Sequence, residues 1–345
     1  MRGTYVTYAT CAVHSPRSRL SLRQSARAGM IPVMPTLRDF LEKINIKAEI
    51  LYDEPMSAHT TFRIGGPADA LVAPADRAGL LALLGAARRE GLPCFVLGGG
   101  ANVVVADRGI RGIVVDTRLL SGINVEASGD GSLLVAGAGT IVDRLVEAAC
   151  DRGLAGLENF YGMPGSVGGA VFMNARCYEV EMADRLAWVE HVALPGGAVL
   201  RRAFDPAEWS YKRSPFQAGG SCAGHIVLAA AFRLRPGDPE ELRRVMAEKH
   251  SDREAKGHYR LPSAGSVFKN DRKLGKPTGK ILDELGMRGR RIGGAMVSEW
   301  HANIFVNAGG ATAADLRALI ELAQREARER LGVELEPEVL FVGDF

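Results

Sequence analysis

The sequence predicts a globular protein that mixes helices and strands and is divided into two or three domains. The chain has 345 residues, and a domain holds roughly 150. Hydrophobic residues make up 47% of the chain and charged residues 24%, as in soluble globular proteins, so a largely disordered chain and a coiled coil are excluded. From Leu37 onward, segments with helical spacing alternate with short β-branched runs.

Two helices and four strands are expected in the first half of the chain. Residues 76–89 carry leucines at helical spacing behind an aspartate that can cap a helix. Residues 140–152 repeat the pattern, with Thr140 and Asp143 as a capping pair and Gly153 as the C-terminal stop. Apolar, β-branched runs bounded by turn residues predict strands at 94–97, 103–105, 113–115 and 132–136.

The second half begins with two more expected strands, at 186–194 and 226–234. Residues 235–239 contain two prolines and a glycine and form the clearest boundary in the chain. A charged helix is expected to start beyond it, over 240–249. The strongest helical pattern covers 312–331, with leucines on one face and Arg and Glu on the other.

The first 30 residues differ from the rest of the chain. They contain five Arg and no Asp or Glu, and they lack the continuous apolar stretch of a secretory signal. The favoured interpretation is a disordered extension or an upstream start site, with Met30 or Met34 as the functional start. A transit peptide is the alternative.

Composition also excludes several partners. The net charge of +3 is too small to indicate nucleic acid, and no apolar run approaches the ~18 to 20 residues of a membrane span. The five cysteines include no Cys-x-x-Cys pair, and the seven histidines show no metal-ligand spacing. We therefore expect neither a disulfide framework nor a metal site, and a reducing cytoplasm as the location.

Glycine is in excess, with 41 residues in the chain and 17 of them between Gly91 and Gly169. Such a cluster can serve tight turns, close packing or a phosphate cradle. Residues 137–142 imitate a dinucleotide fingerprint, but Val142 stands where the third small residue belongs, so a strand-to-helix turn is favoured. Residues 275–280 are one residue short of a Walker loop, and Ile281 replaces its Ser or Thr.

Two other glycine segments predict a bound nucleotide cofactor. The loop 98–102 joins two expected strands without opening a helix, so its N–H groups can form an anion-binding nest against a pyrophosphate. The run 156–175 is rich in small residues and would let a flat heteroaromatic ring lie on the backbone. Plain packing is the alternative for both segments.

Seven motifs in a fixed order then carry a resemblance. They lie at 60–66, 98–102, 162–170, 262–270, 292–295, 298–303 and 336–339. Together they resemble the UDP-N-acetylenolpyruvoylglucosamine reductase family over about residues 36–345. The resemblance implies an α+β protein, with a vanillyl-alcohol-oxidase-type FAD-binding fold of two subdomains and a C-terminal α/β substrate-binding domain.

The domain limits implied by the resemblance are a disordered extension over 1–33, FAD-binding subdomains over 34–105 and 106–236, and a substrate-binding domain over 237–345. The last residues are expected to pack back towards the FAD domain. A helix is expected almost directly after Arg235, so the chain resembles the shorter class of these reductases, which lacks the insertion with a substrate-clamping Tyr.

The implied reaction belongs to peptidoglycan precursor synthesis, and hence to cell wall biogenesis. UDP-N-acetylglucosamine enolpyruvate is reduced to UDP-N-acetylmuramate, with a hydride passing from NADPH to FAD and then to the enolpyruvyl group. The FAD is expected to be non-covalent, because the loop 98–102 contains no His or Cys. The implied protein is a cytoplasmic monomer that acts on a small UDP-sugar.

Three side chains match the family's catalytic positions. Ser266 matches the proton donor, and Glu338 matches the acidic residue that assists with the enolate or its proton. Lys212 stands where the family typically has Arg, so a point charge replaces a bidentate fork. The neighbouring Arg213 is the alternative for this role.

The resemblance also marks binding residues. The expected cofactor contacts are Arg63, Gly98, Gly99, Gly100, Ala101, Asn102, Gly165, Ser166, Gly168, Gly169 and Asn174. The expected substrate contacts are Tyr211, Arg213, Lys256, Tyr259, Lys269 and Asn270. Arg176 stands where many relatives have Gly, and it is either a cation facing the flavin or a phosphate, or part of a surface salt bridge.

Two other functions remain open from the sequence. An oxidase of the same FAD fold, acting on a sugar or alcohol, would be compatible with the glycine loops alone. A non-catalytic nucleotide-binding protein would keep the loops at Gly98 and Gly165 but would need no proton donor. The strictness for NADPH over NADH is not determined by the sequence.

Overall fold

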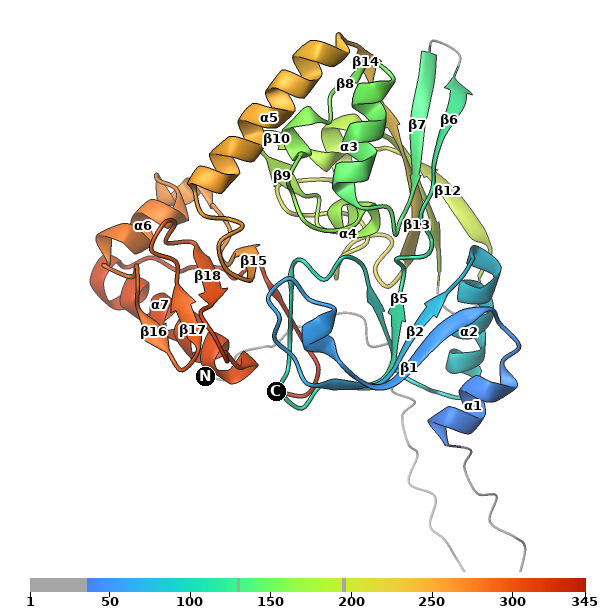
Figure 1. The fold of residues 1–345 in the computed structure, drawn as a ribbon, viewed down its shortest axis with the longest axis horizontal. Coiled ribbons are helices and arrows are strands. Elements are labelled where there is room, and N and C mark those ends of the chain that lie inside the picture. The colour runs from blue at the N-terminus through green and yellow to red at the C-terminus, as the bar shows by residue number, and fades with distance from the viewer. Residues whose placement is uncertain (1–35, 129–130, 194–196) are drawn as a thin grey trace, which may run out of the picture.

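The computed structural model describes residues 36–128, 131–193 and 197–345. These residues form three groups of elements, each built on one main sheet and drawn in Figure 1 in blue to cyan, green to yellow, and orange to red. The expected extension over 1–33 lies outside the described residues. Of the helices in the described ranges, none combines the length and apolar character needed to cross a membrane.

The first group is a four-stranded sheet in the order β1-β2-β5-β3. Its elements are α1 (Leu37–Lys43), β1 (Ala48–Pro55), β2 (Pro67–Pro74), α2 (Arg77–Arg89), β3 (Cys94–Leu97) and β5 (Ile110–Asp116). The predicted helix over 76–89 is confirmed, and a side-chain oxygen of Asp76 accepts the N–H of Gly79 at 2.8 Å as its cap. The fully buried Leu80 and Leu83 hold this helix on the sheet.

The second group is an antiparallel five-stranded sheet in the order β12-β11-β13-β7-β6. Its strands are β6 (Ile123–Ser128), β7 (Gly131–Gly137), β11 (Leu186–Val192), β12 (Val199–Ala203) and β13 (Ile226–Arg233). The helices α3 (Val142–Asp151) and α4 (Val167–Phe172) cover one face of the sheet. The strands predicted over 132–136, 186–194 and 226–234 are thereby confirmed, with β11 ending at Val192.

Short strand pairs and 3₁₀ turns complete this group. The pairs are β8 (Leu154–Ala155) with β14 (Arg235–Pro236), and β9 (Arg176–Cys177) with β10 (Val180–Glu181). Within the described residues, the 3₁₀ turns of this group lie at Glu158–Phe160, Met182–Arg185 and Pro206–Glu208, while Met56–Ala58 belongs to the first group and Arg272–Leu274 to the third. The strand β14 lies in the expected boundary 235–239, and its pairing with β8 attaches this boundary segment to the second group.

The predicted capping pair of α3 is wrong. The Thr140 hydroxyl donates to the carbonyl oxygen of Gly122 at 3.3 Å, and the Asp143 carboxylate accepts the N–H of Gly162 at 2.7 Å. Both side chains thus bind distant backbone groups, and Ile141, the residue before α3, provides no side-chain cap. The predicted stop at Gly153 is confirmed, because its N–H bonds to the carbonyl oxygen of Cys150 at 2.9 Å beyond the helix end.

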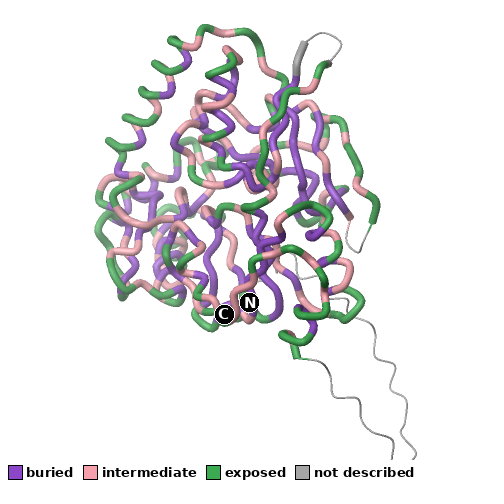
Figure 2. The backbone as a smooth tube through the Cα atoms, turned by 45° about the vertical axis from the view of Figure 1, so that its right-hand side comes forward, coloured by how far each residue is buried: buried purple, intermediate pink, exposed green. Residues whose placement is uncertain are grey.

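The long helix α5 (Pro239–Ala255) leads from the second group to the third (Figure 1). It is longer than the predicted 240–249 and remains largely exposed (Figure 2). The third group contains β15 (Ser263–Ser266), α6 (Thr278–Glu284), β16 (Arg291–Ile292), β17 (Ala295–Val297), β18 (Ile304–Asn307) and α7 (Ala313–Leu331). A capping box of Thr312 and Asp315 opens α7, and this predicted helix is confirmed.

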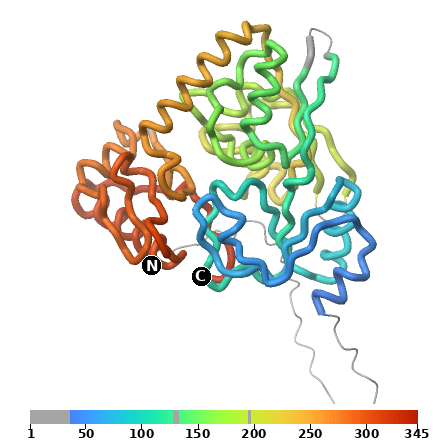
Figure 3. Tube along the Cα trace, viewed as in Figure 1, coloured from blue at the N-terminus to red at the C-terminus, as the bar shows by residue number. Residues whose placement is uncertain are grey.

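The chain ends inside the first group. The last strand, β19 (Leu340–Val342), pairs in parallel with β4 (Val103–Val105), which directly follows the glycine loop 98–102. Figure 3 shows the red C-terminal segment reaching the blue and cyan group. One apolar core also joins the groups, because Phe62 and Val104 are buried in the same cluster as Phe268 and Phe305. The three groups therefore meet around the glycine loop.

Candidate active site

A cavity of about 410 Å³ lies at this meeting point. Its walls come from the β9–β10 hairpin, the loop before β13, the end of β15, the loop over 270–277 that leads to α6, and the segment before β19. Six residues singled out from the sequence line it, namely Arg176, Tyr211, Lys212, Ser266, Asn270 and Glu338. The cavity thus brings together side chains that lie up to 162 positions apart, from Arg176 to Glu338.

Lys212 and Glu338 form an ion pair in the cavity wall. The distance from Lys212 Nζ to Glu338 Oε1 is 2.5 Å, and the side chains are only 13% and 11% exposed. Lys212 has a left-handed backbone, with φ +57°, inside a tight turn in which Ser210 and Arg213 bond to each other. The amide of Gln217 fixes the turn by donating to the carbonyl oxygen of Lys212 at 3.1 Å.

This turn separates the two candidates for the cationic role. Lys212 lines the cavity, whereas Arg213 is exposed and lies outside the lining. A left-handed conformation at a residue with a side chain costs roughly 1–2 kcal/mol and is typical of functional sites. Here it accompanies the approach of Nζ to Glu338.

Ser266 lies at the end of β15, beside the segment that carries Glu338. The N–H of Glu338 donates to the carbonyl oxygen of Val267 at 2.7 Å, so the two chains run side by side. In the part of the chain that the structure describes, the Ser266 hydroxyl has no hydrogen-bond partner. It is therefore free to donate to a molecule in the cavity.

The glycine loop 98–102 adjoins the same site. The Asn102 amide donates to the backbone oxygen of Glu338 at 3.0 Å, and the N–H of Leu340 donates to the carbonyl oxygen of Asn102 at 2.9 Å. Among the described residues, no protein acceptor takes the backbone N–H groups of Gly100, Ala101 and Asn102. Free N–H groups on successive residues attract an anion such as a phosphate.

The loop also needs its glycines for close packing. A Cβ on Gly99 would lie 2.6 Å from the Cα of Gly165, and one on Gly100 would collide with the carbonyl oxygen of His59. Gly100 has φ +64°, which a side chain would strain further. Ser166 accepts the N–H of Gly99 at 3.2 Å and caps α4, so the two glycine segments are locked together. This arrangement fits the phosphate groups of a nucleotide cofactor.

Other residues expected to bind the cofactor also have partners within the protein. The Asn174 side chain is fully buried and bonds to Glu181, Ser210 and Ala183, and its contact with the cofactor stays a prediction. The N–H of Gly168 donates to the carbonyl oxygen of Ala138 at 2.8 Å, so this glycine packs α4 on the neighbouring turn.

Gly169 and Arg63 also have partners within the protein. The N–H of Gly169 reaches the Ser166 hydroxyl at 3.4 Å, so it belongs to the cap of α4. Arg63 is exposed, and its carbonyl oxygen accepts the amide of Asn307 in the third group at 3.3 Å.

The expected substrate residues divide into two sets. Tyr211 and Asn270 are joined across the cavity, because the N–H of Asn270 donates to the Tyr211 hydroxyl oxygen at 3.1 Å. The other four, Arg213 included, lie outside the lining. Lys256 pairs with Asp252 at 2.6 Å, Lys269 pairs with Glu336 at 2.6 Å, and the Tyr259 hydroxyl donates to Gly162 at 2.9 Å.

The β9–β10 hairpin contributes residues that sequence reasoning missed. Tyr178 and Glu179 form its two-residue turn, both with positive φ, and both line the cavity. Burial and a hydrogen bond to Asp252 raise the pKa of the Tyr178 phenol. Arg176 lies over the ring of Tyr211 at 5.4 Å and pairs with Glu179. The hairpin is too short to carry a sequence signal.

Two further cations lie at the site: Arg253 contacts the β9–β10 hairpin, and Lys276 belongs to the loop before α6. Arg253 is buried and donates to the Cys177 sulfur at 3.0 Å, and its Nε is the one buried side-chain nitrogen or oxygen without a partner among the described residues. Burial raises the pKa of the Cys177 thiol, against the opposing effect of Arg253. Lys276 also lines the cavity, and the sequence analysis did not single it out.

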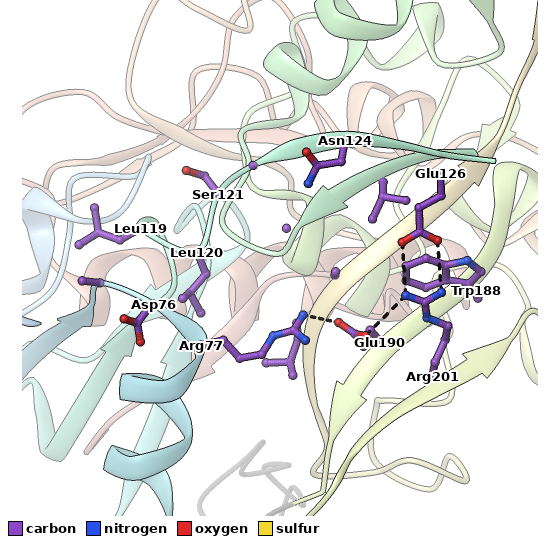
Figure 4. A pocket seen from close by; sticks show the side chains of 16 residues that line it. Asp76, Arg77, Leu119, Leu120, Ser121, Asn124, Glu126, Trp188, Glu190 and Arg201 are labelled. Atoms are coloured by element: carbon purple, nitrogen blue, oxygen red, sulfur yellow. Dashed lines mark hydrogen bonds and ion pairs between the residues drawn. The ribbon is translucent and has the colours of Figure 1, made fainter. Parts of the chain in front are cut away.

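A second cavity, of about 480 Å³, lies between α2 and the five-stranded sheet (Figure 4). Its charged side chains neutralise one another: Arg77 pairs with Glu190, and Arg201 pairs with Glu126 at 3.2 Å while lying over the Trp188 ring. None of the residues expected to bind cofactor or substrate lines it. The chemistry is therefore assigned to the cavity that holds Lys212 and Glu338.

The fold and the nucleotide-fitting glycine loop beside a paired cation and carboxylate define an FAD-binding oxidoreductase. Residues 68–202 match the FAD binding domain family, and residues 257–342 match the C-terminal domain of UDP-N-acetylenolpyruvoylglucosamine reductase. The reductase of Treponema denticola is 40% identical over 304 residues, covering 86% of this chain and 94% of that protein. The chain belongs to the UDP-N-acetylenolpyruvoylglucosamine reductase family.

Other comparisons agree with this family. The reductase of Rubrobacter xylanophilus is 45% identical over 294 residues, covering 85% of this chain and 95% of that protein. The crystal structure of the Thermus caldophilus reductase matches with a TM-score of 0.68 and 34% identity, covering 86% and 99% of the two chains. The predicted family and its α+β FAD-binding fold are confirmed, and the cofactor is FAD.

Proposed function

We propose that this chain is a cytoplasmic, monomeric, NADPH-dependent reductase that converts UDP-N-acetylglucosamine enolpyruvate to UDP-N-acetylmuramate. The observation that carries the proposal is the convergence of Lys212, Glu338 and the unpartnered Ser266 hydroxyl beside the glycine loop. FAD, when bound, supplies to the substrate the hydride that NADPH delivers. The protein must then hold the substrate carboxylate, stabilise the developing enolate and provide one proton.

Lys212 is assigned to the first two tasks. Its ammonium group is held in a largely buried wall, where a fixed charge interacts with an anion more strongly than in water. Glu338 positions this ammonium group through the ion pair, and Asn102 and Val267 hold the backbone of Glu338. The substrate carboxylate and Glu338 would then share the donors of one ammonium group.

Ser266 is assigned as the proton donor. The hydride is added to the terminal alkene carbon, and the hydroxyl of Ser266 gives its proton to the carbon that bears the carboxylate, so the double bond is reduced. The proton on Ser266 is afterwards replaced from solvent. A positioned acid of this kind typically contributes 10²–10⁴-fold to the rate.

The remaining cations suit the substrate diphosphate. Arg176 and Lys276 line the same cavity as Tyr211 and Asn270, and Arg253 is buried behind the hairpin with an unpaired Nε. Arg and Lys both bind phosphate, Arg through a planar fork and Lys as a point charge. We therefore assign the diphosphate to this rim of the cavity and the enolpyruvyl group to Lys212 and Ser266.

The test uses the purified full-length protein and separates the two half-reactions. We expect a yellow protein whose flavin is reduced by NADPH and reoxidised by the enolpyruvyl nucleotide, with NADH as the comparison donor. Ser266→Ala should slow reoxidation more than about 10²-fold and leave reduction unchanged. Ser263→Ala, in the same strand, is the matched control and should leave both steps intact.

Three results would contradict the proposal. A colourless protein that cannot be reconstituted with FAD would remove the cofactor assignment. Rapid reoxidation by oxygen with an alcohol, without a response to the nucleotide, would identify an oxidase. Equal damage to both half-reactions in Ser266→Ala would remove the proton-donor role.

A further inference from the structure

Three potential metal ligands converge in the second group, away from the residues that line the active-site cavity. His191 lies on β11, and Cys222 and His225 lie in the loop before β13. The ligand atoms of all three lie within 4.8 Å of one another, and the two Nδ1 atoms are 2.9 Å apart. His191 and Cys222 are only 2% and 3% exposed.

We propose that His191, Cys222 and His225 bind a zinc ion. Zn²⁺ is held by thiolate and imidazole ligands at about 2.3 and 2.0–2.1 Å in a tetrahedral arrangement, which sets neighbouring ligand atoms roughly 3.4–3.6 Å apart. The observed spacing reaches this geometry with small rotations of the side chains. One sulfur and two imidazole nitrogens also favour zinc over magnesium or calcium, which prefer oxygen ligands.

The local backbone holds the three ligands in place. A register irregularity between Glu190 and His191 puts His191 opposite Val227 of β13. The N–H of His225 donates to the carbonyl oxygen of Cys222 at 3.0 Å, which closes a turn carrying two of the ligands. The Phe216 ring packs against the His191 ring with centroids 5.4 Å apart. Two ligands are therefore fixed before any ion binds, which reduces the entropy lost on binding.

The charges around the cluster permit a divalent ion. The nearby Arg202 is bound by both carboxylate oxygens of Glu208, at 2.8 and 2.5 Å, so its charge is already compensated. Ser221 also donates to Glu208, at 2.6 Å. Binding would release the Cys222 thiol proton to solvent, with no change of oxidation state. Because His225 is partly exposed, water would supply the fourth ligand of the ion.

The site would anchor the loop that carries the catalytic lysine. The segment from Lys212 to Cys222 is bonded internally, because Gln217 donates to Lys212 and the N–H of Cys222 donates to the carbonyl oxygen of Pro215 at 2.9 Å. An ion at Cys222 would tie the far end of this segment to β11. Without an ion, the same geometry is a hydrogen bond between the two imidazoles, with the thiol uninvolved.

The experiment measures zinc bound to the untagged, full-length, FAD-loaded protein. After removal of metals with a chelator, addition of Zn²⁺ and dialysis, we expect one zinc per chain. Co²⁺ in its place should give visible bands of a tetrahedral thiolate site at wavelengths longer than those oxidised flavin absorbs. His225→Gln and Cys222→Ser should each weaken zinc binding by more than about 100-fold, since even outer partners of a ligand can contribute that much.

Matched controls separate this site from other cysteines. Cys150→Ser changes a buried cysteine outside the cluster, and Cys11→Ser changes one outside the described residues; both should retain the zinc. The flavin spectrum verifies that each variant is folded, and His225→Gln alters the least buried ligand. Absence of zinc from the unmodified protein, or full retention by Cys222→Ser, would overturn the proposal whether or not the reductase assignment holds.

Discussion

The ion pair between Lys212 and Glu338 allows stability and catalysis to be separated in one set of variants. Both side chains are nearly nine-tenths buried, with Nζ and Oε1 2.5 Å apart. Removing one partner of a buried pair typically costs 3–5 kcal/mol, because the other charge is left uncompensated. Since a tenth of each side chain reaches solvent, we expect about 2–3 kcal/mol for Lys212→Met and for Glu338→Gln.

The double variant decides between the two roles of the pair. With both charges removed, no charge is left uncompensated, so the free energy of unfolding should return to within about 1 kcal/mol of the unmodified protein. Flavin reoxidation should not recover, since loss of a preorganised donor at a developing anion costs about 10²–10³ in rate. Lys212→Arg should retain most of this rate, and Arg213→Ala, at the exposed neighbour, is the control.

Denaturant unfolding and stopped-flow reoxidation of the flavin measure these two effects. A coupling energy below about 0.5 kcal/mol between the two sites would refute the structural part of this reasoning. If Lys212→Met reoxidised within a few-fold of the normal rate, the electrostatic role would be refuted. If Arg213→Ala were then the damaged variant, the cation would be the neighbouring arginine.

Three further predictions follow from backbone conformation and burial. Gly100→Ala would drive a Cβ into the carbonyl oxygen of His59 and should abolish FAD retention, whereas Gly91→Ala, also at positive φ but in open space, should cost only about 1 kcal/mol of stability and keep the flavin colour. Burial lowers the pKa of His258 from 6.5 to about 4, so between these pH values only the unfolded state binds the proton, and stability should fall by about 2 kcal/mol, after allowance for solvent, as the pH is lowered from 6.5 to 4; a pH series of unfolding should show a smaller loss in His258→Gln than in the unmodified protein. Glu179→Gly should raise the melting temperature by about 2 °C by relieving a left-handed residue, and an unchanged or lower value would contradict the strain.

Local patterns in the sequence predicted the elements whose signals are local. The helix over 76–89 and the helix over 312–331 combine apolar spacing with a capping residue, and both form as expected. The predicted capping pair at Thr140 and Asp143 is wrong because both side chains bind groups far away along the chain. Its carboxylate binds Gly162, which is 19 positions away and absent from any local window. The long-range hydrogen bond from Gly162 thus outweighs the local tendency of Asp143 to cap the helix.

Ordered motifs predicted the family and the cofactor, and the match of family and fold confirms both. They could not predict which contacts each residue makes. Asn174 lies shortly after the motif at 162–170, and its side-chain amide bonds to Glu181, Ser210 and Ala183. A motif preserves the order of residues along the chain, whereas hydrogen-bond partners depend on which strands lie beside it.

The contact between Lys212 and Glu338 shows why the geometry of the site could not be predicted from the sequence: it depends on how distant segments fold together. From the sequence, only the position within the family motif favours Lys212 over Arg213 for the cationic role. On an extended backbone the two side chains would point to opposite sides. A positive φ at Lys212 and the parallel pairing of β19 with β4 together bring a lysine and a glutamate 126 positions apart into contact. The same reasoning applies to His191, Cys222 and His225. Their spacing in the chain resembles no metal motif, so they were excluded as ligands until the register of β11 and β13 brought them together.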